Sequence, residues 1–252
     1  MTTLTAQLEK NRLLACLPAS ERNVLDEHMD VVSLRPKEEL NGVGSPVRYL
    51  LFPIDSAISL MDFKPDGGVV EVALIGKEGC TGSTAVQGSK NALCRVLVQV
   101  GGSALRVRLP SVLKALPQLP FFRFALSRFT TTILRATIVS VGCSQFHSVE
   151  QRLGRWFLAH QDRTGASVFP FTHDFLAEQL GVQRATVSEA LAGLQERKII
   201  KYGYRQVELS NARAMEKLSC ECFPAVKKAI DEFLRDIKRP TLIPRRAAAK
   251  RR

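Results

Sequence analysis

The chain has 252 residues and a formal net charge of +12, with 45% hydrophobic and 24% charged residues. This ordinary globular composition excludes a fibrous or wholly disordered protein, and the length suits two domains. From His147 onward 20 basic residues accompany 12 acidic ones, which predicts a polyanionic partner such as nucleic acid or an acidic membrane surface.

The sequence carries no pattern that directs a protein into or across a membrane. Its longest stretch without a charged residue, residues 136–149, is shorter than the roughly 20 residues that span a bilayer. The N-terminus lacks a basic leader followed by a sustained apolar run. We therefore expect a cytoplasmic protein without membrane contact, in which the six dispersed cysteines are reduced.

Residues 1–118 combine a helical lead-in with a β-rich region. Apolar positions as far as Leu25 suit short amphipathic helices. From about Val31 to Leu109, short β-rich runs alternate with turn signals such as Pro65-Asp66-Gly67-Gly68. Many short strands with glycine-rich turns predict a small antiparallel barrel or roll.

Residues 119–162 are predicted to form a long central helix followed by a hinge. One apolar stripe recurs at steps of four and three, and Leu134, Ile138 and Val141 form a second. Two stripes indicate that the β domain covers one face and a partner helix the other, with a helix buried inside a monomer as the alternative. We assign to the dimer helix Phe122, Leu126, Phe129, Ile133, Ala136 and Ser140.

Residues 163–238 contain the strongest signal, a helix-turn-helix pattern from His173 to Gln195. Thr172 suits an N-cap, and Gly181 suits the turn. Leu176, Ala177, Leu180, Val182, Val187 and Ala190 would form its core. The second helix is expected to start near Gln183 or Arg184. Two short β runs then form a wing around Gly203, and a basic tail, residues 239–252, is expected to be disordered.

The second helix would present to a major groove the side chains that read bases. We assign base reading to Arg184, Ala185, Ser188 and Glu189. We assign contacts with the DNA backbone to Thr172, His173, Gln183, Thr186, Tyr204 and Arg205. Double-stranded DNA is therefore the predicted partner, and a purely protein-binding winged helix is the alternative.

The order of β-roll, long helix and winged helix resembles the Crp/Fnr superfamily of bacterial transcription regulators over nearly the whole chain. The resemblance rests on FTHDFLAEQLGVQRATVSEALAGLQERKIIKY, on HSVEQRLGRWFLAHQDR and on NRLLACLPASE. The stretch LSCECF at residues 218–223 resembles a subgroup without an assigned effector. An α+β fold is implied, with an N-terminal antiparallel β-roll of the cyclic-nucleotide-binding, jelly-roll type, a dimerisation helix and a C-terminal winged helix-turn-helix. The resemblance further implies a homodimer that binds palindromic promoter sites, responds to a signal at the β-roll and contacts RNA polymerase.

Two departures from the cyclic-AMP type of this family alter what we expect. The recognition helix retains Arg184 but has Ala185 and Glu189 where that type has Glu and Arg, so its half-site should differ. The loop at residues 79–83 lacks the ribose-binding Glu, and no Ser-Ala follows Arg95. We assign the effector pocket to Gly82, Ser83 and Arg95. The effector is unknown, and cyclic AMP is not expected.

Cofactor and enzyme signatures are absent from the sequence. An iron–sulfur sensor needs several cysteines ahead of the β-roll, where only Cys16 lies. Cys220 and Cys222 lack a second close pair, so we predict no metal site and interpret them as buried thiols. The histidines, His28, His147, His160 and His173, form no haem motif. A redox-, haem- or metal-responsive regulator of the same fold is the alternative, and the lack of catalytic motifs predicts a protein that is not an enzyme.

Overall fold

The computed structural model describes residues 4–65, 67–203 and 206–238, and it opens with a helical lead-in. The lead-in comprises α1 (Leu4–Leu8), α2 (Arg12–Ala15) and α3 (Ala19–Asp26). The buried Asn11 side chain caps α2 at the amide of Leu14. Its Nδ2 donates to the carbonyls of Pro53 and Gly79, at 3.0 and 2.9 Å. This side chain therefore joins the lead-in to the sheets that follow.

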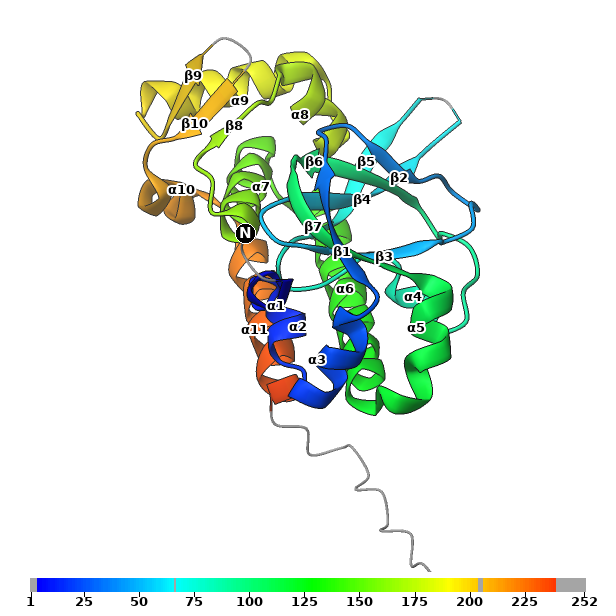
Figure 1. Ribbon diagram of the computed structural model, residues 1–252. Helices are drawn as coiled ribbons and strands as arrows, with labels where there is room; N and C mark the ends of the chain where they lie inside the picture. The colour runs from blue at the N-terminus through cyan, green and yellow to red at the C-terminus, as the bar shows by residue number, and fades with distance from the viewer. Residues whose placement is uncertain (1–3, 66, 204–205, 239–252) are drawn as a thin grey trace, which may run out of the picture.

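Two antiparallel sheets form the β domain, which confirms the predicted antiparallel roll (Figure 1). One sheet has the order β1-β7-β3 and the other the order β2-β6-β4-β5. Their strands are β1 (Met29–Leu34), β2 (Glu39–Asn41), β3 (Tyr49–Pro53), β4 (Ala57–Phe63), β5 (Val69–Ile75), β6 (Arg95–Val100) and β7 (Gly102–Arg108). Leu34, Ile58 and Val98 belong to one buried apolar cluster that holds the two sheets face to face.

The predicted long helix is two helices. After α4 (Ser83–Val86), α5 (Leu109–Ala115) and the 3₁₀ turn η1 (Leu116–Gln118), the chain forms α6 (Pro120–Phe146) and then α7 (Val149–Thr164). The break has a local cause, because Ser148 Oγ accepts from the amide of Gln151 while the Gln151 side chain accepts from the amide of Ser148. This capping box starts a new helix. Within the described residues, no helix is long and apolar enough to span a bilayer.

The C-terminal unit begins with α7, at Val149, which is earlier than the start at residue 163 that the sequence predicts. It continues with β8 (Val168–Phe169), α8 (His173–Leu180), α9 (Arg184–Glu196), β9 (Ile200–Gly203), β10 (Gln206–Leu209) and α10 (Ala212–Leu218). Trp156 and Phe157 of α7 share one buried core with Leu176 of α8 and Val187 of α9. The strands form a small sheet in the order β8-β10-β9, which supplies the predicted wing.

The last helix, α11 (Cys222–Lys238), runs back along α6 (Figure 1). Its apolar face is buried, with Phe233 packed at 5.6 Å between ring centroids on Phe129. Ion pairs flank this contact, at 2.5 Å between Arg128 and Asp236 and at 3.0 Å between Arg135 and Glu232. The predicted tail, residues 239–252, lies outside the described residues.

Candidate DNA-binding site and effector cavity

A helix-turn-helix is built by α8 and α9, and local chemistry fixes its turn. Thr172 Oγ1 accepts a hydrogen bond of 3.2 Å from the amide of Phe175 and caps α8. Gly181 ends α8 in the left-handed region at φ 62°, which favours glycine. After Gln183 as N-cap, α9 begins at Arg184. The predicted cap, turn and start of the second helix are confirmed.

A buried core holds α8 and α9 together, as the pattern predicts. Leu176, Ala177, Leu180 and Val187 are buried, and Val182 and Ala190 are partly buried. The rings of Phe171 and Phe175 stack at 4.9 Å beside the indole of Trp156. A core packed on α7 in this way keeps the outer face of α9 in a fixed orientation.

The outer face of α9 is open to solvent. Gln183, Arg184, Ala185, Thr186 and Glu189 are exposed, and Ser188 is half-buried. Nε of Arg184 lies 3.1 Å from Oδ1 of Asp174, and the two side chains are 65% and 69% exposed. An ion pair this exposed contributes little stability, so the guanidinium can leave it at low cost.

His173 links the start of α8 to α9 and to the wing. Its Nδ1 lies 2.6 Å from Ser188 Oγ, and its ring centroid lies 4.6 Å from that of Tyr202. Burial lowers the pKa of His173, Arg184 lowers it further and Asp174 opposes both. His173 therefore orients the hydroxyl of Ser188 through a hydrogen bond inside the protein. Two residues predicted to contact the DNA backbone, Tyr204 and Arg205, lie outside the described residues.

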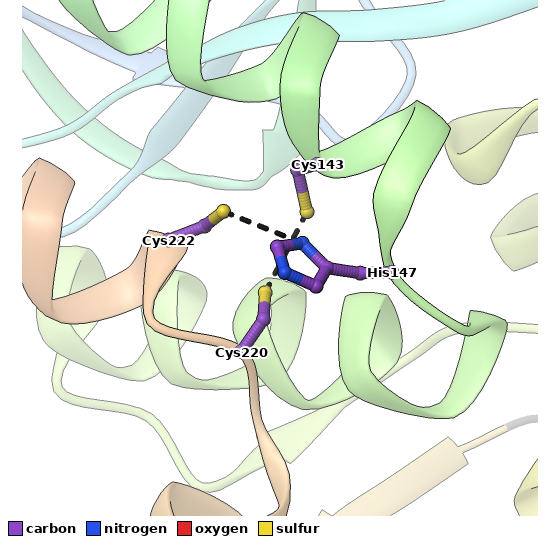
Figure 2. A group of neighbouring side chains, drawn as sticks. All are labelled: Cys143, His147, Cys220 and Cys222. Atoms are coloured by element: carbon purple, nitrogen blue, oxygen red, sulfur yellow. Dashed lines mark hydrogen bonds between the residues drawn. The ribbon is translucent and has the colours of Figure 1, made fainter.

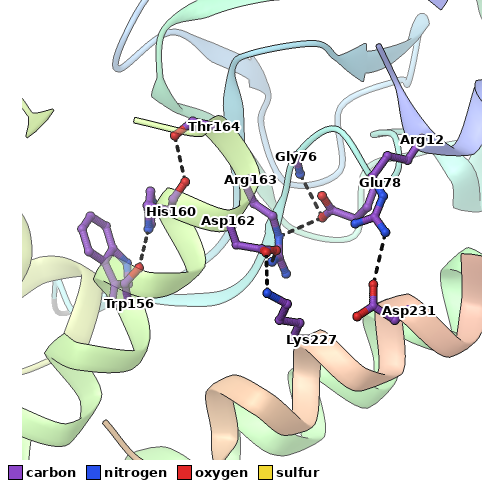
Figure 3. Close-up of polar contacts among 10 residues, drawn as sticks. All are labelled: Arg12, Gly76, Glu78, Trp156, His160, Asp162, Arg163, Thr164, Lys227 and Asp231. Carbon is purple, nitrogen blue, oxygen red and sulfur yellow. Dashed lines mark hydrogen bonds and ion pairs between the residues drawn. The ribbon is translucent and has the colours of Figure 1, made fainter. Parts of the chain in front are cut away.

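In this arrangement the helix-turn-helix is docked on the β domain. Gln179 of α8 accepts a hydrogen bond from Gln99 Nε2 of β6, and both side chains are buried. Arg163 of α7 and Glu78 form a buried ion pair, with 3.1 Å between Nε and Oε1 (Figure 3). Oε1 of Glu78 also accepts a hydrogen bond from the amide of Gly76 at 3.0 Å. Sequence reasoning missed the Gln99–Gln179 and Glu78–Arg163 contacts because each joins residues far apart in the chain.

A cavity of about 490 Å³ lies between the β domain and α6. Gly82 and Ser83 line it, as the sequence predicts, and Phe129, Ile133 and Leu134 of α6 close its other side. Its size suits a small molecule. None of the described residues that line it is charged. The cavity therefore offers hydroxyl, amide and apolar groups to a ligand, without a cation.

The assignment of Arg95 to this cavity is wrong. Arg95 pairs with Glu39, and its guanidinium carbon lies 4.3 Å from the ring centroid of Phe63. These residues line a separate hollow next to α8. The cause is the alternation of side chains along β6, because Val96 faces the large cavity and Arg95 points to the other side of the sheet.

The first apolar stripe of α6 is mainly a core stripe. Phe122, Leu126 and Phe129 are buried in one cluster with residues of the β domain and α11. Their assignment to a contact with a partner helix is therefore wrong. The remaining residues of that assignment, Ile133, Ala136 and Ser140, are half-buried.

The second stripe of α6 is the exposed one. Leu134, Ile138 and Val141 are 59%, 63% and 61% exposed and follow one another at steps of four and three. That spacing places all three on one side of the helix. Leu134 also lines the large cavity, so this apolar stripe and the cavity share a side chain.

The fold brings together four side chains that sequence reasoning left apart. Cys143 and His147 at the end of α6 meet Cys220 and Cys222 at the start of α11, with all ligand atoms within 4.8 Å of one another (Figure 2). The available signal was the four-residue spacing of Cys143 and His147, which places both on one face of a helix. Cys220 and Cys222 lack a second close pair in the sequence, but the fold places a cysteine and a histidine beside them.

We expect the stability of the protein to fall in acid through His160 of α7. His160 is buried, and its Nδ1 lies 2.8 Å from the carbonyl of Trp156 (Figure 3). Among the described residues, its Nε2 has no hydrogen-bond partner. Burial, together with the charges of Arg163 and Arg155, lowers the pKa of His160 to about 3, although the bond to Trp156 opposes the shift. Since the unfolded chain takes up this proton first, each pH unit between roughly 6.5 and 3 costs up to about 1.4 kcal/mol.

Urea unfolding of the protein and of His160→Phe at several pH values measures this contribution. The variant should show a shallower loss of stability between pH 6.5 and pH 4, since a phenyl ring fits the apolar surroundings and cannot take up a proton. Parallel curves would show that His160 titrates alike in the folded and unfolded chains.

Comparison with known proteins agrees with this geometry. Residues 151–218 match the family of Crp-like helix-turn-helix domains. No curated protein sequence matches the chain. Among solved structures, FixK2 from Bradyrhizobium japonicum has a TM-score of 0.64 at 20% identity, over 76% of this chain and 98% of that one. A CRP-family transcriptional regulator from Thermus thermophilus has a TM-score of 0.60 at 20% identity, over 75% and 96%.

A third structure is CLP from Xanthomonas campestris, described as a c-di-GMP-responsive global regulator. Its TM-score is 0.61 at 15% identity, over 76% of this chain and 99% of that one. Similarity at these identities is similarity of fold. The chain therefore carries a Crp-like helix-turn-helix domain at residues 151–218 and has the fold of Crp/Fnr transcription regulators.

Proposed function

We propose that the protein is a sequence-specific transcription regulator that binds inverted repeats in double-stranded promoter DNA as a homodimer. The observation that carries the proposal is the exposed outer face of α9 within a Crp-like helix-turn-helix domain. A major groove admits such a helix, and a net charge of +12 favours a polyanionic partner. On this proposal the protein is a regulator rather than an enzyme, works in the cytoplasm and has RNA polymerase as a further partner.

Base reading on this proposal centres on Arg184, whose fork of donors matches O6 and N7 of guanine. Glu189, five residues further along α9, can only accept, for example from N4 of cytosine. Ala185 and Ser188 lie beside them on the same helix. Backbone positioning is assigned to Thr172, His173, Gln183, Thr186, Tyr204 and Arg205. Of these, Gln183 and Thr186 are exposed, which supports a contact with phosphate.

Selection of bound fragments from random duplex DNA tests the proposal, and the Arg184→Ala variant tests the role of this residue. The full-length protein should enrich an inverted repeat with one half-site per recognition helix, the half-sites being about 34 Å apart. Arg184→Ala should bind this repeat about 1–3 kcal/mol more weakly and lose preference at one position of each half-site.

The matched control is Arg205→Ala, which should weaken all sequences alike and reduce the salt dependence of binding. Unchanged specificity in Arg184→Ala would exclude Arg184 as a base-reading residue. Enrichment of no palindrome by the unaltered protein would contradict DNA recognition itself and favour a basic protein-interaction module.

The homodimer is proposed on the exposed stripe of α6 formed by Leu134, Ile138 and Val141. Apolar side chains at this spacing suit a parallel pair of helices related by a two-fold axis. Two chains paired in this way carry two copies of α9, one for each half-site. A single helix-turn-helix per chain otherwise reads only half of an inverted repeat.

The signal is proposed to bind in the cavity between the β domain and α6, and it is not cyclic AMP. A buried phosphate carries a charge that a nearby cation stabilises best, and none of the described residues lining the cavity is charged. Arg95 cannot supply the charge because it lines the separate hollow on the other side of the sheet. The same reasoning disfavours c-di-GMP, to which the structurally similar CLP responds. An uncharged ligand suits the lining best.

We expect cyclic AMP to leave DNA binding by the purified protein unchanged. The measurement is a binding isotherm on the selected DNA with and without the nucleotide. Tight binding without any additive would indicate a dimer controlled by its own abundance. Weak binding that micromolar cyclic AMP rescues would overturn our interpretation of the cavity, and weak binding that it does not rescue would agree with an uncharged effector.

A further inference from the structure

We propose that Cys143, His147, Cys220 and Cys222 bind a single Zn²⁺ ion where α6, the link after α10 and the start of α11 meet. Three thiolates and one imidazole are a set of ligands that zinc takes in closed, structural sites. The inference is independent of the proposed function, because it rests on the side chains of this junction and requires no DNA.

The spacing of the ligand atoms suits one ion. Sγ of Cys143 lies 3.6 Å from Sγ of Cys220, and Sγ of Cys222 lies 3.6 Å from Nδ1 of His147. Around a tetrahedral zinc with bonds of about 2.3 Å, two sulfurs lie about 3.8 Å apart. All four atoms lie within 4.8 Å of one another, and a cluster of several irons with bridging sulfides needs more room between its ligands.

The four ligands come from segments that the fold must bring together. Cys143 is buried in the last turn of α6, and His147 follows as its C-cap in an extended conformation, φ −114° and ψ 146°. Cys220 is 77 residues from Cys143 along the chain, and Cys222 is the first residue of α11. Figure 2 shows their side chains converging on one point. Buried thiols that act only as small apolar residues have no reason to converge with an imidazole.

A second polar contact orients the histidine as a metal ligand. Nε2 of His147 lies 3.1 Å from Oε1 of Glu221, while Nδ1 faces the sulfur of Cys222. With its Nε2–H donated to this carboxylate, the ring presents the Nδ1 lone pair to an ion. A carboxylate behind a ligating imidazole is the usual arrangement in zinc sites. Because the Glu221 side chain is 79% exposed, this side of the site also gives an ion access from solvent.

The charge around the site suits a zinc complex with three thiolates. Zn²⁺ with three thiolates and a neutral imidazole has a net charge of −1, after the thiols release their protons to solvent. Arg152 and Arg155 of α7 lie near enough to interact electrostatically with Cys143. Their guanidinium groups therefore balance the complex. Four protein ligands leave no open position, which makes the site structural rather than catalytic.

A zinc ion here would fix the junction that connects the helix-turn-helix unit to the rest of the chain. His147 is the last residue before Ser148 starts α7, and Cys220 and Cys222 begin the helix that returns along α6. The ion would therefore clamp both chain connections of the unit formed by α7 to α10 at one point.

The test uses full-length protein purified under reducing, oxygen-free conditions. As isolated it should contain about one zinc per chain by elemental analysis. After chelation, titration with Co²⁺ should give intense visible ligand-field bands and thiolate charge-transfer bands of a tetrahedral sulfur-ligated ion, saturating at one equivalent. Cys220→Ser should lose both signals, while Cys94→Ser, a partly buried cysteine outside the cluster, should keep both.

A second variant keeps the test informative if Cys220→Ser fails to fold. Glu221→Gln alters an exposed carboxylate that is not a ligand, so the variant should fold normally and bind Co²⁺ about 10–100-fold more weakly. The proposal fails if the unaltered protein holds no zinc and gives only the weak spectrum of octahedral Co²⁺. It also fails if Cys94→Ser loses the metal equally.

Discussion

If the proposed homodimer forms through this stripe, replacing Ile138 with glutamate is expected to leave the protein monomeric and to weaken its binding to an inverted repeat about 10²–10⁴-fold. Ile138 is 63% exposed at the centre of the apolar stripe of α6. A two-fold axis would bring both copies of the new carboxylate into the interface, where each costs several kcal/mol to bury unpaired. The affinity loss follows because two half-sites then bind separately instead of as one linked pair.

Analytical ultracentrifugation and titration of the selected DNA measure both effects. The matched control is Leu113→Glu, which introduces the same charge at an exposed leucine of α5, outside the apolar stripe of α6. It should leave mass and DNA affinity unaltered. A dimer that persists in Ile138→Glu would exclude the stripe as the dimer contact.

Replacing Arg163 with methionine should lower the free energy of unfolding by about 3–5 kcal/mol at neutral pH. The variant leaves the Glu78 carboxylate buried with the amide of Gly76 as its remaining donor. An uncompensated buried charge carries a cost of this size. Arg163 also contacts Asp162 at 2.7 Å, but Lys227 lies 3.2 Å from that carboxylate and remains as its partner (Figure 3).

Urea unfolding of three variants, measured against the unaltered protein, separates the buried pair from general effects of the substitution. The double variant Arg163→Met/Glu78→Gln should recover part of the loss, because the remaining amide is neutral. Arg135→Met breaks an exposed pair with Glu232 and should cost less than about 1 kcal/mol. Equal, small losses in Arg163→Met and Arg135→Met would contradict a role for the buried pair in holding α7 on the β domain.

The helix-turn-helix could be predicted closely because short-range chemistry determines it. Thr172 caps α8 through an amide three residues away. Gly181 adopts a positive φ, which depends only on the residue at that position. The strands of the β domain could be predicted equally well, since the alternation of apolar and polar residues and the turn residues are local patterns. Such signals are complete within a few residues of sequence.

The division of the long helix was harder to predict although its cause is also local. Ser148 and Gln151 form the capping box that starts α7, but apolar residues continue with helical spacing across the break. Periodicity also cannot tell which stripe of α6 faces its own chain. Only the packing of α11 and the β domain shows that the stripe at Phe129 is covered and that the one at Ile138 is open.

The remaining features that the sequence did not predict depend on contacts between distant parts of the chain. Cys143 and Cys220 meet across 77 residues, so neither local spacing nor composition reveals their proximity. Arg95 lies at the expected place in the sequence, but the pleat of β6 directs it toward Glu39 and away from the cavity. A shift of one residue in a strand reverses the face that a side chain occupies.

Leu134 has a consequence for how the protein would respond to a signal. Its side chain lines the cavity and also belongs to the exposed stripe of α6, so a bound ligand and a partner chain would contact the same residue. Linkage then makes the effect reciprocal: a ligand that strengthens association tenfold is itself bound tenfold more tightly by the associated form. The amount of the protein in the cell would therefore set the ligand concentration at which it responds, and scarce protein would need more ligand than abundant protein.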